Sequence, residues 1–288
     1  CISELYKKRK FIIMNILNEI AEKTRERIER DKKEMPREDL INEIRQKKVQ
    51  MLLNPLIQSE TAKTPHSFYQ ALKKTGMSYI CEVKKASPSK GLIAPDFPYL
   101  NIAKEYEAAG ASAISCLTEP FYFQGSDRYL QEIAGNVNIP VLRKDFTVDE
   151  YMIYQAKAFG ASAVLLICAI LDNVQLKAFG ELAQDLGLDA LVEAHDEWEV
   201  DRALNLEAKI VGVNNRNLHD FTVDMENSVR LRKMAPENTV FVSESGIKTS
   251  KDIRILYQNR VDAVLIGENL MRSPDKKAAL EELNKDIV

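Results

Sequence analysis

The sequence predicts an α/β fold, a (β/α)8 TIM barrel that follows an N-terminal helical extension. Eight short apolar runs alternate with amphipathic stretches at intervals of roughly 20–35 residues, the length of one strand and one helix. The runs are almost continuously apolar, as expected of parallel strands covered on both faces. An open doubly wound sheet is the alternative, but no GxGxxG follows the first run and no GxxxxGK[ST] occurs. The predicted strands are Tyr79–Val83, Ala113–Leu117, Ile139–Leu142, Ala163–Cys168, Ala190–Glu193, Ile210–Val213, Val240–Ser243 and Ala263–Gly267.

Length and composition fit a single domain of this kind. The chain has 288 residues, and single barrels of ~250 residues are ordinary. The net charge is −3, so nothing in the overall charge favours nucleic acid or an anionic membrane as a partner. The basic start is followed by an apolar run that is too short and too broken for a signal peptide, and no run reaches the ~18 apolar residues of a membrane span. We therefore expect a cytoplasmic protein; its oligomeric state is left open, and a monomer fits.

Two amphipathic helices precede the first predicted strand. Ile16 and Ile20 lie at helical spacing with charged residues between them. Pro36 starts a second segment, Arg37 to Leu53, which Pro55 ends. The apolar repeat is too brief for a coiled coil, so we expect both helices to pack onto a larger body.

Small residues repeat before two of the predicted strands. The same Gly-Ala-Ser-Ala sequence begins at Gly110 and at Gly160. Each glycine is expected to end a helix with a positive φ angle, which a residue without Cβ adopts at little cost.

The cysteines predict reduced, buried thiols. No two of the four cysteines form a CxxC pair, so neither a metal clip nor a thioredoxin-like motif is indicated. Cys81, Cys116 and Cys168 each lie in an apolar run, which predicts free thiols in a reducing compartment.

Polar residues at the ends of the apolar runs are the candidate active site, because βα barrels place their chemistry at the carboxyl ends of the strands. Glu82 and Lys84 are two residues apart and point to the same side of the first strand. A carboxylate and an ammonium held close can tune each other's pKa for acid–base work, although a structural ion pair is the alternative. Ser87 follows in a rigid Ser-Pro-Ser turn.

The third strand is followed by a second charged group. Lys144 is a candidate general acid whose charge also attracts an anionic substrate. Arg143 and Asp145 alternate with it and are expected to face outward, while Phe146 is placed to stack against a ring. A surface loop cluster is the alternative.

The fifth and sixth strands add a carboxylate and hydrogen-bonding groups. Glu193 is the only charge that closes the fifth run, and for His195 a loop or capping role is expected rather than catalysis. Asn214 can hydrogen-bond a hydroxyl, and Arg216 can fork onto a carboxylate. An Asn-rich turn is the alternative for this last segment.

The seventh and eighth strands each end near a glycine. Backbone N–H groups at Ser245-Gly246 and at Gly267-Glu268 are placed to form the phosphate cradle typical of barrels. We expect Glu268 to contact a phosphate through its backbone N–H, with its side chain turned away.

Together these motifs resemble those of the indole-3-glycerol-phosphate synthase family of tryptophan biosynthesis. The resemblance runs from about Met14 to the C-terminus, and the first-strand motif is its most specific part. The residues that carry it are Glu82–Gly91, Leu117–Pro120 with Phe123 and Gly125–Ser126, Leu142–Phe146, Leu191–Glu193, Gly212–Arg216 and Ser243–Ile247.

The resemblance implies a carbon–carbon lyase, a carboxy-lyase, that needs neither a metal nor an organic cofactor. The implied reaction closes the ring of 1-(2-carboxyphenylamino)-1-deoxy-D-ribulose 5-phosphate, with loss of carbon dioxide and water, to give indole-3-glycerol phosphate. The resemblance also implies that residues 14–60 cover the mouth of a single barrel domain, 14–288, and that residues 1–13 are an upstream extension without a catalytic part.

The resemblance further implies roles for named residues, although it leaves open which lysine is the acid in each step. The expected catalytic residues are Glu82, Lys84, Lys144, Glu193 and Asn214. The expected substrate-binding residues are Ser87, Phe123, Phe146, Arg216, Leu218 and Ser245. The expected phosphate-binding residues are Ser245, Gly246, Gly267 and Glu268.

Two other functions fit the sequence less well. An isomerase of the phosphoribosylanthranilate type requires an Asp/Cys acid–base pair at strand ends, which the lysine-rich mouth does not supply. A non-catalytic barrel that serves as a binding protein has no need of the charged set at the strand ends.

Overall fold

Eight parallel strands close into a barrel in the order β1-β10-β9-β8-β7-β6-β5-β4, as the sequence predicts. The structure is a computed structural model; it describes residues 2–53, 67–217 and 222–287, and the side chains of these except 2–15 and 51–53. The barrel strands are β1 Ser78–Val83, β4 Ala113–Leu117, β5 Val141–Lys144, β6 Ala163–Ile167, β7 Asp189–Ala194, β8 Ile210–Asn214, β9 Val240–Glu244 and β10 Ala263–Ile266. Strands β2 Ala86–Ser87 and β3 Gly91–Leu92 form a separate antiparallel hairpin.

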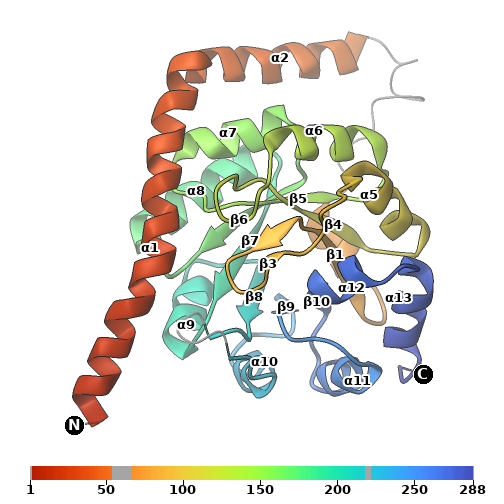
Figure 1. Ribbon diagram of the computed structural model, residues 1–288. Helices are drawn as coiled ribbons and strands as arrows, with labels where there is room; N and C mark the ends of the chain where they lie inside the picture. The colour runs from red at the N-terminus through yellow and green to blue at the C-terminus, as the bar shows by residue number, and fades with distance from the viewer. Residues whose placement is uncertain (1, 54–66, 218–221, 288) are drawn as a thin grey trace.

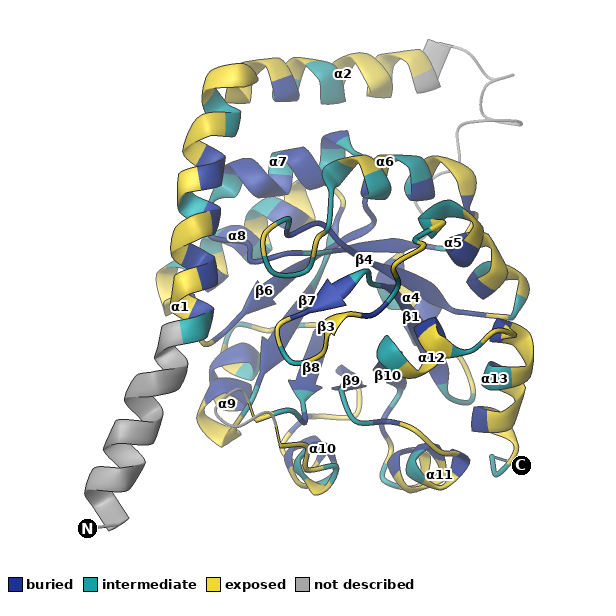
Figure 2. Cartoon of the chain, viewed as in Figure 1, coloured by how far each residue is buried: buried dark blue, intermediate teal, exposed yellow. Residues whose placement is uncertain are grey.

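Helices surround the barrel and turn their exposed sides outward (Figures 1 and 2). Several begin at a Ser, Thr or Asp whose side chain accepts a backbone N–H, as Asp172 and Thr249 do in capping boxes. The short helix α4, Phe68–Leu72, precedes β1. The others are α5 Tyr99–Ala108, α6 Asp127–Asn136, α7 Glu150–Ala158, α8 Asn173–Asp185, α9 Glu197–Asn205, α10 Glu226–Arg232, α11 Ser250–Gln258, α12 Glu268–Arg272 and α13 Lys276–Asn284.

The predicted strands agree with the structure to within two residues. The largest difference is β5, which begins at Val141 and not at residue 139, because Pro140 has no N–H to donate to a neighbouring strand. The structure also extends three strands to include Lys144, Asn214 and Glu244. These side chains are thus held by the sheet itself.

The core has two layers, one inside the barrel and one between the barrel and its helices. Along β1 the buried side chains alternate, with Ile80 in the inner layer and Cys81 in the outer one. Cys81, Cys116 and Cys168 are buried and free, as predicted. Gly110 and Gly160 have φ angles of 94° and 86°, which confirms their predicted role at helix ends.

Two N-terminal helices lie against one side of the barrel (Figure 1). Helix α1, Ile2–Glu34, runs without a break, and α2, Arg37–Leu53, has the bounds predicted from Pro36; Pro55 lies outside the described residues. Ile28 and Leu40 pack in a cluster with α7. The boundary at residue 14 remains a prediction.

Among the described residues, no helix is both long and apolar enough to cross a membrane.

A buried ion pair ties α1 to the end of β5. Arg27 Nη2 donates to Asp145 Oδ2 over 2.9 Å, and Thr118 Oγ1 donates to the same oxygen over 2.6 Å. Burial raises the pKa of Asp145, but the positive charges of Arg27 and Arg143 outweigh it and hold that pKa below its ordinary value. Arg143 points outward, as predicted, and its Nη2 donates to Asp127 on α6 over 2.8 Å. The N-terminal helix is thus anchored at Asp145, the residue that follows Lys144 in the sequence.

Replacing Arg27 with Ala is expected to lower the free energy of unfolding by about 3 kcal/mol, because it leaves a buried carboxylate without its main partner. The cost is at the low end of the range for such pairs because Arg143 lies 3.7 Å from the same oxygen. Urea denaturation measures the change. Arg25→Ala is the matched control, since Arg25 pairs with Glu22 on the exposed side of the same helix and should cost less than about 0.5 kcal/mol. Equal losses in the two variants would contradict the anchoring role.

Candidate active site

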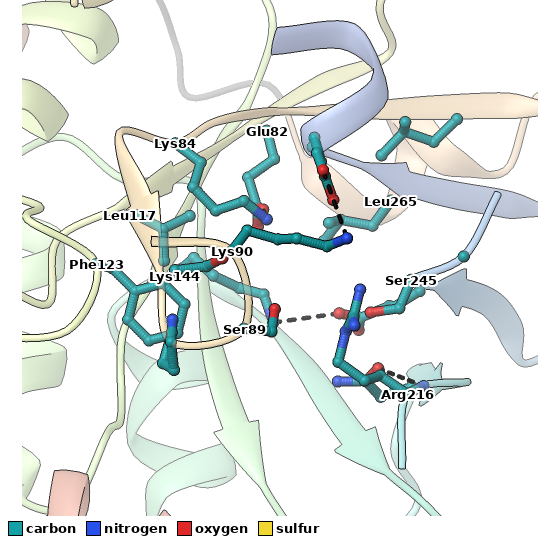
Figure 3. A pocket seen from close by; sticks show the side chains of 18 of the residues that line it. Glu82, Lys84, Ser89, Lys90, Leu117, Phe123, Lys144, Arg216, Ser245 and Leu265 are labelled. Carbon is teal, nitrogen blue, oxygen red and sulfur yellow. Dashed lines mark hydrogen bonds and ion pairs between the residues drawn. The ribbon is translucent and has the colours of Figure 1, made fainter. Parts of the chain in front are cut away.

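A cavity of about 540 Å³ opens at the carboxyl ends of the barrel strands. Figure 3 shows side chains that are far apart in the sequence projecting toward this one space, among them Glu82, Lys144 and Arg216. Leu218 lies outside the described residues. All the other predicted site residues line the cavity, namely Glu82, Lys84, Ser87, Phe123, Lys144, Phe146, Glu193, Asn214, Arg216, Ser245, Gly246, Gly267 and Glu268.

Glu82 and Lys84 form an ion pair on one wall of the cavity. Their Oε1 and Nζ atoms are 2.5 Å apart, and Ser115 Oγ donates to Glu82 Oε2 over 3.4 Å. Gly267, on the neighbouring β10 side, leaves room for the pair, since a Cβ there would come within 2.5 Å of the Glu82 carboxylate and 2.8 Å of the Lys84 ammonium. The glycine predicted from phosphate binding therefore also has a steric role.

Lys144, at the end of β5, lies between two carboxylates. Its Nζ donates to Glu193 Oε2 over 2.7 Å and to Glu244 Oε2 over 3.1 Å. Burial lowers the pKa of Lys144, but the negative charges of Glu193 and Glu244 outweigh it and raise that pKa above its ordinary value. Lys144 is therefore a protonated ammonium at neutral pH, available to donate.

The two carboxylates that flank Lys144 titrate differently. Burial raises the pKa of Glu193, but the charge of Lys144 outweighs it and lowers that pKa to about 2. Burial dominates at Glu244 and raises its pKa to about 7, with a further rise from the negative charge of Glu193. At neutral pH, Glu193 is thus the more firmly ionised of the two carboxylates.

Glu244 was not among the predicted site residues. The predicted strand ended at Ser243, whereas Glu244 is the last residue of β9 and closes an apolar run just as Glu193 does. A charged residue that closes an apolar run was therefore present in the sequence, one residue beyond the predicted end of the strand. A Cβ at Gly212 on the adjacent strand would collide with the Glu244 carboxylate, so this glycine makes room for it.

Asn214 and His195 contact the other oxygen of Glu193. Asn214 Nδ2 donates to Glu193 Oε1 over 3.4 Å, and His195 Nε2 lies 3.4 Å from the same atom. Asn214 Oδ1 in turn accepts from the backbone N–H of Arg216 over 3.1 Å. His195 therefore contacts Glu193, a residue of the cavity, which the predicted loop or capping role did not include.

The turn after β9 has two consecutive residues in the left-handed region. Ser245 has a φ angle of 67° and Gly246 one of 86°. Asn215, which the sequence did not single out, holds this turn, since its Nδ2 donates to Ser243 Oγ over 2.9 Å and to the Ser245 carbonyl over 3.2 Å. A Cβ at Gly246 would collide with the Val223 side chain, so the turn admits only glycine there.

Two cations flank Glu268 at the rim of the cavity. Its Oε1 lies 3.8 Å from Lys90 Nζ and 3.2 Å from Arg272 Nε. Lys90 reaches across from the turn between β2 and β3 (Figure 3). These contacts hold the side chain of Glu268 at the rim, and Lys90 joins the set of site residues.

Apolar side chains form the remaining wall. The ring centroids of Phe123 and Phe146 are 6.2 Å apart with the planes inclined at 39°. Ile16, Leu17 and Ile20 of α1 also line the cavity, so the N-terminal helix supplies part of the wall. Two sides of the cavity are thus charged, and the third can hold an aromatic ring out of water.

Comparison with known protein families gives one family match that covers most of the chain. The model of the family described as indole-3-glycerol phosphate synthase matches residues 17–283. An indole-3-glycerol phosphate synthase of Ruminiclostridium cellulolyticum is 52% identical over 268 residues, which cover 93% of this chain and 98% of that protein. One of Endomicrobium trichonymphae is 60% identical over 217 residues, which cover 75% of this chain and 84% of that protein.

Among solved structures, the fold is similar to that of other barrel enzymes. The 3-hexulose-6-phosphate synthase of Salmonella typhimurium aligns with a TM-score of 0.60 at 13% identity, over 73% of this chain and 97% of that chain. At this identity the likeness extends to the fold alone.

Replacing Glu244 with Gln is expected to change how stability depends on pH. A carboxyl whose pKa is raised from 4.5 to about 7 on folding stabilises the fold fully below the lower value, and this stability is lost as the pH rises through the upper one. Between these limits the wild type should lose roughly 2–3 kcal/mol of unfolding free energy relative to Glu244→Gln.

Urea denaturation across this pH range measures the difference between the two proteins. Glu281→Gln is the control, since Glu281 is exposed and its pair with Lys277 spans 3.9 Å. Parallel pH curves for the wild type and Glu244→Gln would show that Glu244 is not a buried titrating group.

Proposed function

The chain belongs to the indole-3-glycerol-phosphate synthase family, and we propose that the residues gathered at its barrel mouth carry out that family's reaction. The activity is that of a carboxy-lyase, which converts 1-(2-carboxyphenylamino)-1-deoxy-D-ribulose 5-phosphate to indole-3-glycerol phosphate. The observation that carries the proposed mechanism is the position of Lys144, between Glu193 and Glu244 and in the same cavity as the Glu82–Lys84 pair.

The first step is a condensation that needs a proton donor. The ring carbon that bears the carboxylate attacks the C2′ carbonyl, and negative charge develops on the carbonyl oxygen. Lys144, kept protonated by its two carboxylates, donates a proton to this oxygen. The electrons of the bond to the carboxylate then restore the aromatic ring, and carbon dioxide leaves.

The second step removes the C2′ hydroxyl as water. A lysine supplies the proton that lets hydroxide leave as water, and Glu193 or Glu82 accepts the proton released from the substrate. Lys84, which pairs with Glu82, and Lys144, which pairs with Glu193, are both placed for the donor role. Glu193 is ionised before the reaction, and its affinity for a proton rises once Lys144, whose charge lowers the pKa of Glu193, has donated its own proton.

The rest of the cavity suits the other parts of the substrate. Phe123, Phe146 and the apolar residues of α1 offer a surface for the anthranilate ring. Lys84 and Arg216 suit the substrate carboxylate, and Asn214 and Ser87 can hydrogen-bond hydroxyls. For the phosphate we propose the backbone N–H groups of Ser245-Gly246 and Gly267-Glu268, with Lys90 as a nearby cation. Leu218 keeps its proposed binding role from the family motif alone.

Further features of the organisation remain part of the proposal. We propose that residues 14–60 act as the segment over the barrel mouth and that residues 1–13 have no catalytic part. A cytoplasmic location is proposed from the free buried thiols of Cys81, Cys116 and Cys168. The proposed partner is the phosphorylated substrate alone, without nucleic acid or membrane.

The direct test of the proposed function supplies the purified chain with the carboxyphenylamino-deoxyribulose phosphate and follows the appearance of indole fluorescence. The proposal expects turnover at micromolar to millimolar substrate, the ordinary range of KM for enzymes. No product at saturating substrate and high protein concentration would refute it.

Replacing Lys144 with Ala is expected to lower kcat by ~10²–10⁴-fold, the usual loss when a general acid is removed. Stopped-time assays at saturating substrate give kcat, and circular dichroism checks that the barrel is retained. Lys177→Ala is the control, because Lys177 is an exposed lysine whose nearest acidic partner is Glu181 at 3.9 Å. A Lys144→Ala variant as active as this control would remove Lys144 from the mechanism.

Lys84 and Lys85 offer a matched pair of adjacent lysines. Lys84 projects into the cavity, whereas the side chain of Lys85 is not among those that line it. Lys84→Met is expected to lower kcat/KM by at least ~10²-fold, since it removes a charge that serves substrate binding or acid catalysis. Lys85→Met should stay within about two-fold of the wild type. Losses of equal size would mean that overall charge, and not position, accounts for the effect.

A further inference from the structure

The imidazole of His195 lies between two carboxylates at the edge of the active site. Its Nε2 is 3.4 Å from Glu193 Oε1, and its Nδ1 is 3.0 Å from Glu199 Oε2. The ring is largely buried, with 18% of the side chain exposed. Nδ1 is within hydrogen-bond distance of Glu199, whereas Nε2 has no hydrogen-bond partner among the described residues, so the ring acts on Glu193 through a positive charge that only the imidazolium carries.

We propose that His195 is a positioning residue of the reaction, held as an imidazolium that fixes Glu193 and favours the return of its proton to Lys144. This inference rests on the proposed function, since it assumes that Glu193 accepts a proton from the substrate. His195 touches Glu193 and not the reacting atoms, so it acts through that carboxylate.

The surroundings of His195 hold its ring in place. The backbone N–H of His195 donates to Glu199 Oε2 over 2.8 Å, and Asn227 Nδ2, from α10, donates to the His195 carbonyl over 3.1 Å. Glu199 is itself buried at the start of α9. The backbone and both ring nitrogens of His195 thus have defined neighbours, as expected of a residue that orients another.

The charges around the ring favour the cation. Glu193 on β7, Glu199 on α9 and Glu244 on β9 are the acidic groups that act on it, and the thiol of Cys168, at the end of β6, donates to the Glu199 carbonyl over 3.7 Å. Burial lowers the pKa of His195, but the hydrogen bond to Glu199 and the negative charges outweigh it and raise that pKa. The ring therefore stays protonated to a higher pH than an exposed histidine would.

The cation has a use in completing the catalytic cycle. After Lys144 has donated a proton and Glu193 has accepted one, the two groups are a neutral amine and a neutral acid 2.7 Å apart. Transfer of the proton from Glu193 Oε2 to Lys144 Nζ restores this carboxylate and this ammonium. Solvent supplies the second proton that the lysines donate, since the loss of a carboxylate as carbon dioxide consumes one proton per turnover. A positive His195 beside Glu193 Oε1 stabilises that carboxylate and so favours the transfer, while His195 itself neither gains nor loses a proton.

The kinetic test compares two substitutions at His195. His195→Gln keeps a donor but removes the charge, and we expect kcat to fall about ten-fold with KM within about two-fold, the effect of about one unit in the pKa of Glu193. His195→Ala removes both and should lower kcat further. Glu197→Gln is the control, because this exposed residue of the same helix pairs with Arg230 and not with the ring. Wild-type kcat in His195→Gln would overturn the proposal.

A nuclear magnetic resonance titration tests the same coupling without activity. The chain has three histidines, and the ring signal of His195 is the one that is lost in His195→Gln. In the wild type it should titrate above the ordinary value of about 6.5, and in Glu193→Gln its pKa should fall by about one unit. Glu197→Gln should leave it unchanged.

The two readouts separate the two proposals. A His195 ring that titrates alike in the wild type and in Glu193→Gln would overturn the inference even if every variant is active. A wild-type chain that makes no product would instead count against the proposed function.

Discussion

The burial of one ammonium group between two carboxylates is the constraint on which this active site depends. A charged side chain that leaves water loses several kcal/mol of solvation unless opposite charges and hydrogen bonds replace it. Lys144 meets this condition because Glu193 and Glu244 lie within 3.1 Å of its Nζ. Lys144 and its two partners come from β5, β7 and β9, every second strand of the ring, so only a closed barrel brings their side chains to one layer.

Other features of the molecule follow from holding these charges in place. Gly212 and Gly267 are required where a Cβ would occupy the space of the Glu244 and Glu82 carboxylates. The pair between Arg27 and Asp145 fixes the residue that follows Lys144 and ties α1 to the same strand end. The N-terminal helix then contributes apolar residues to the cavity wall. The same contacts therefore stabilise the fold and hold the charged side chains of the site in position.

The sequence predicted the barrel and most of the site because both follow a local rule. Apolar runs mark parallel strands, and a polar residue that closes such a run lies at the mouth, which is how Glu82, Lys144 and Glu193 were found. Glu244 was missed because the end of its strand was placed one residue early.

Asn215, Lys90 and the contact of His195 with Glu193 were missed for a different reason. Lys90 and Asn215 lie within recognised motif segments, but the roles of all three arise from turns and partners that converge in space, which the order of residues does not reveal. The apolar residues of α1 were predicted to pack, but a helical period does not tell which barrel end they face.

The measurement that tests the central claim most directly is the pKa of the Lys144 ammonium, followed by nitrogen-15 resonance of labelled lysine and assigned with a Lys144→Arg variant. With both carboxylates present, the pKa should lie above the ordinary lysine value of about 10.4. In the Glu193→Gln, Glu244→Gln double variant, the charge of Glu82 is left as the opposing influence on burial, and the pKa should fall below that value. A wild-type pKa at or below the ordinary value, or one that the double substitution leaves unchanged, would contradict the account.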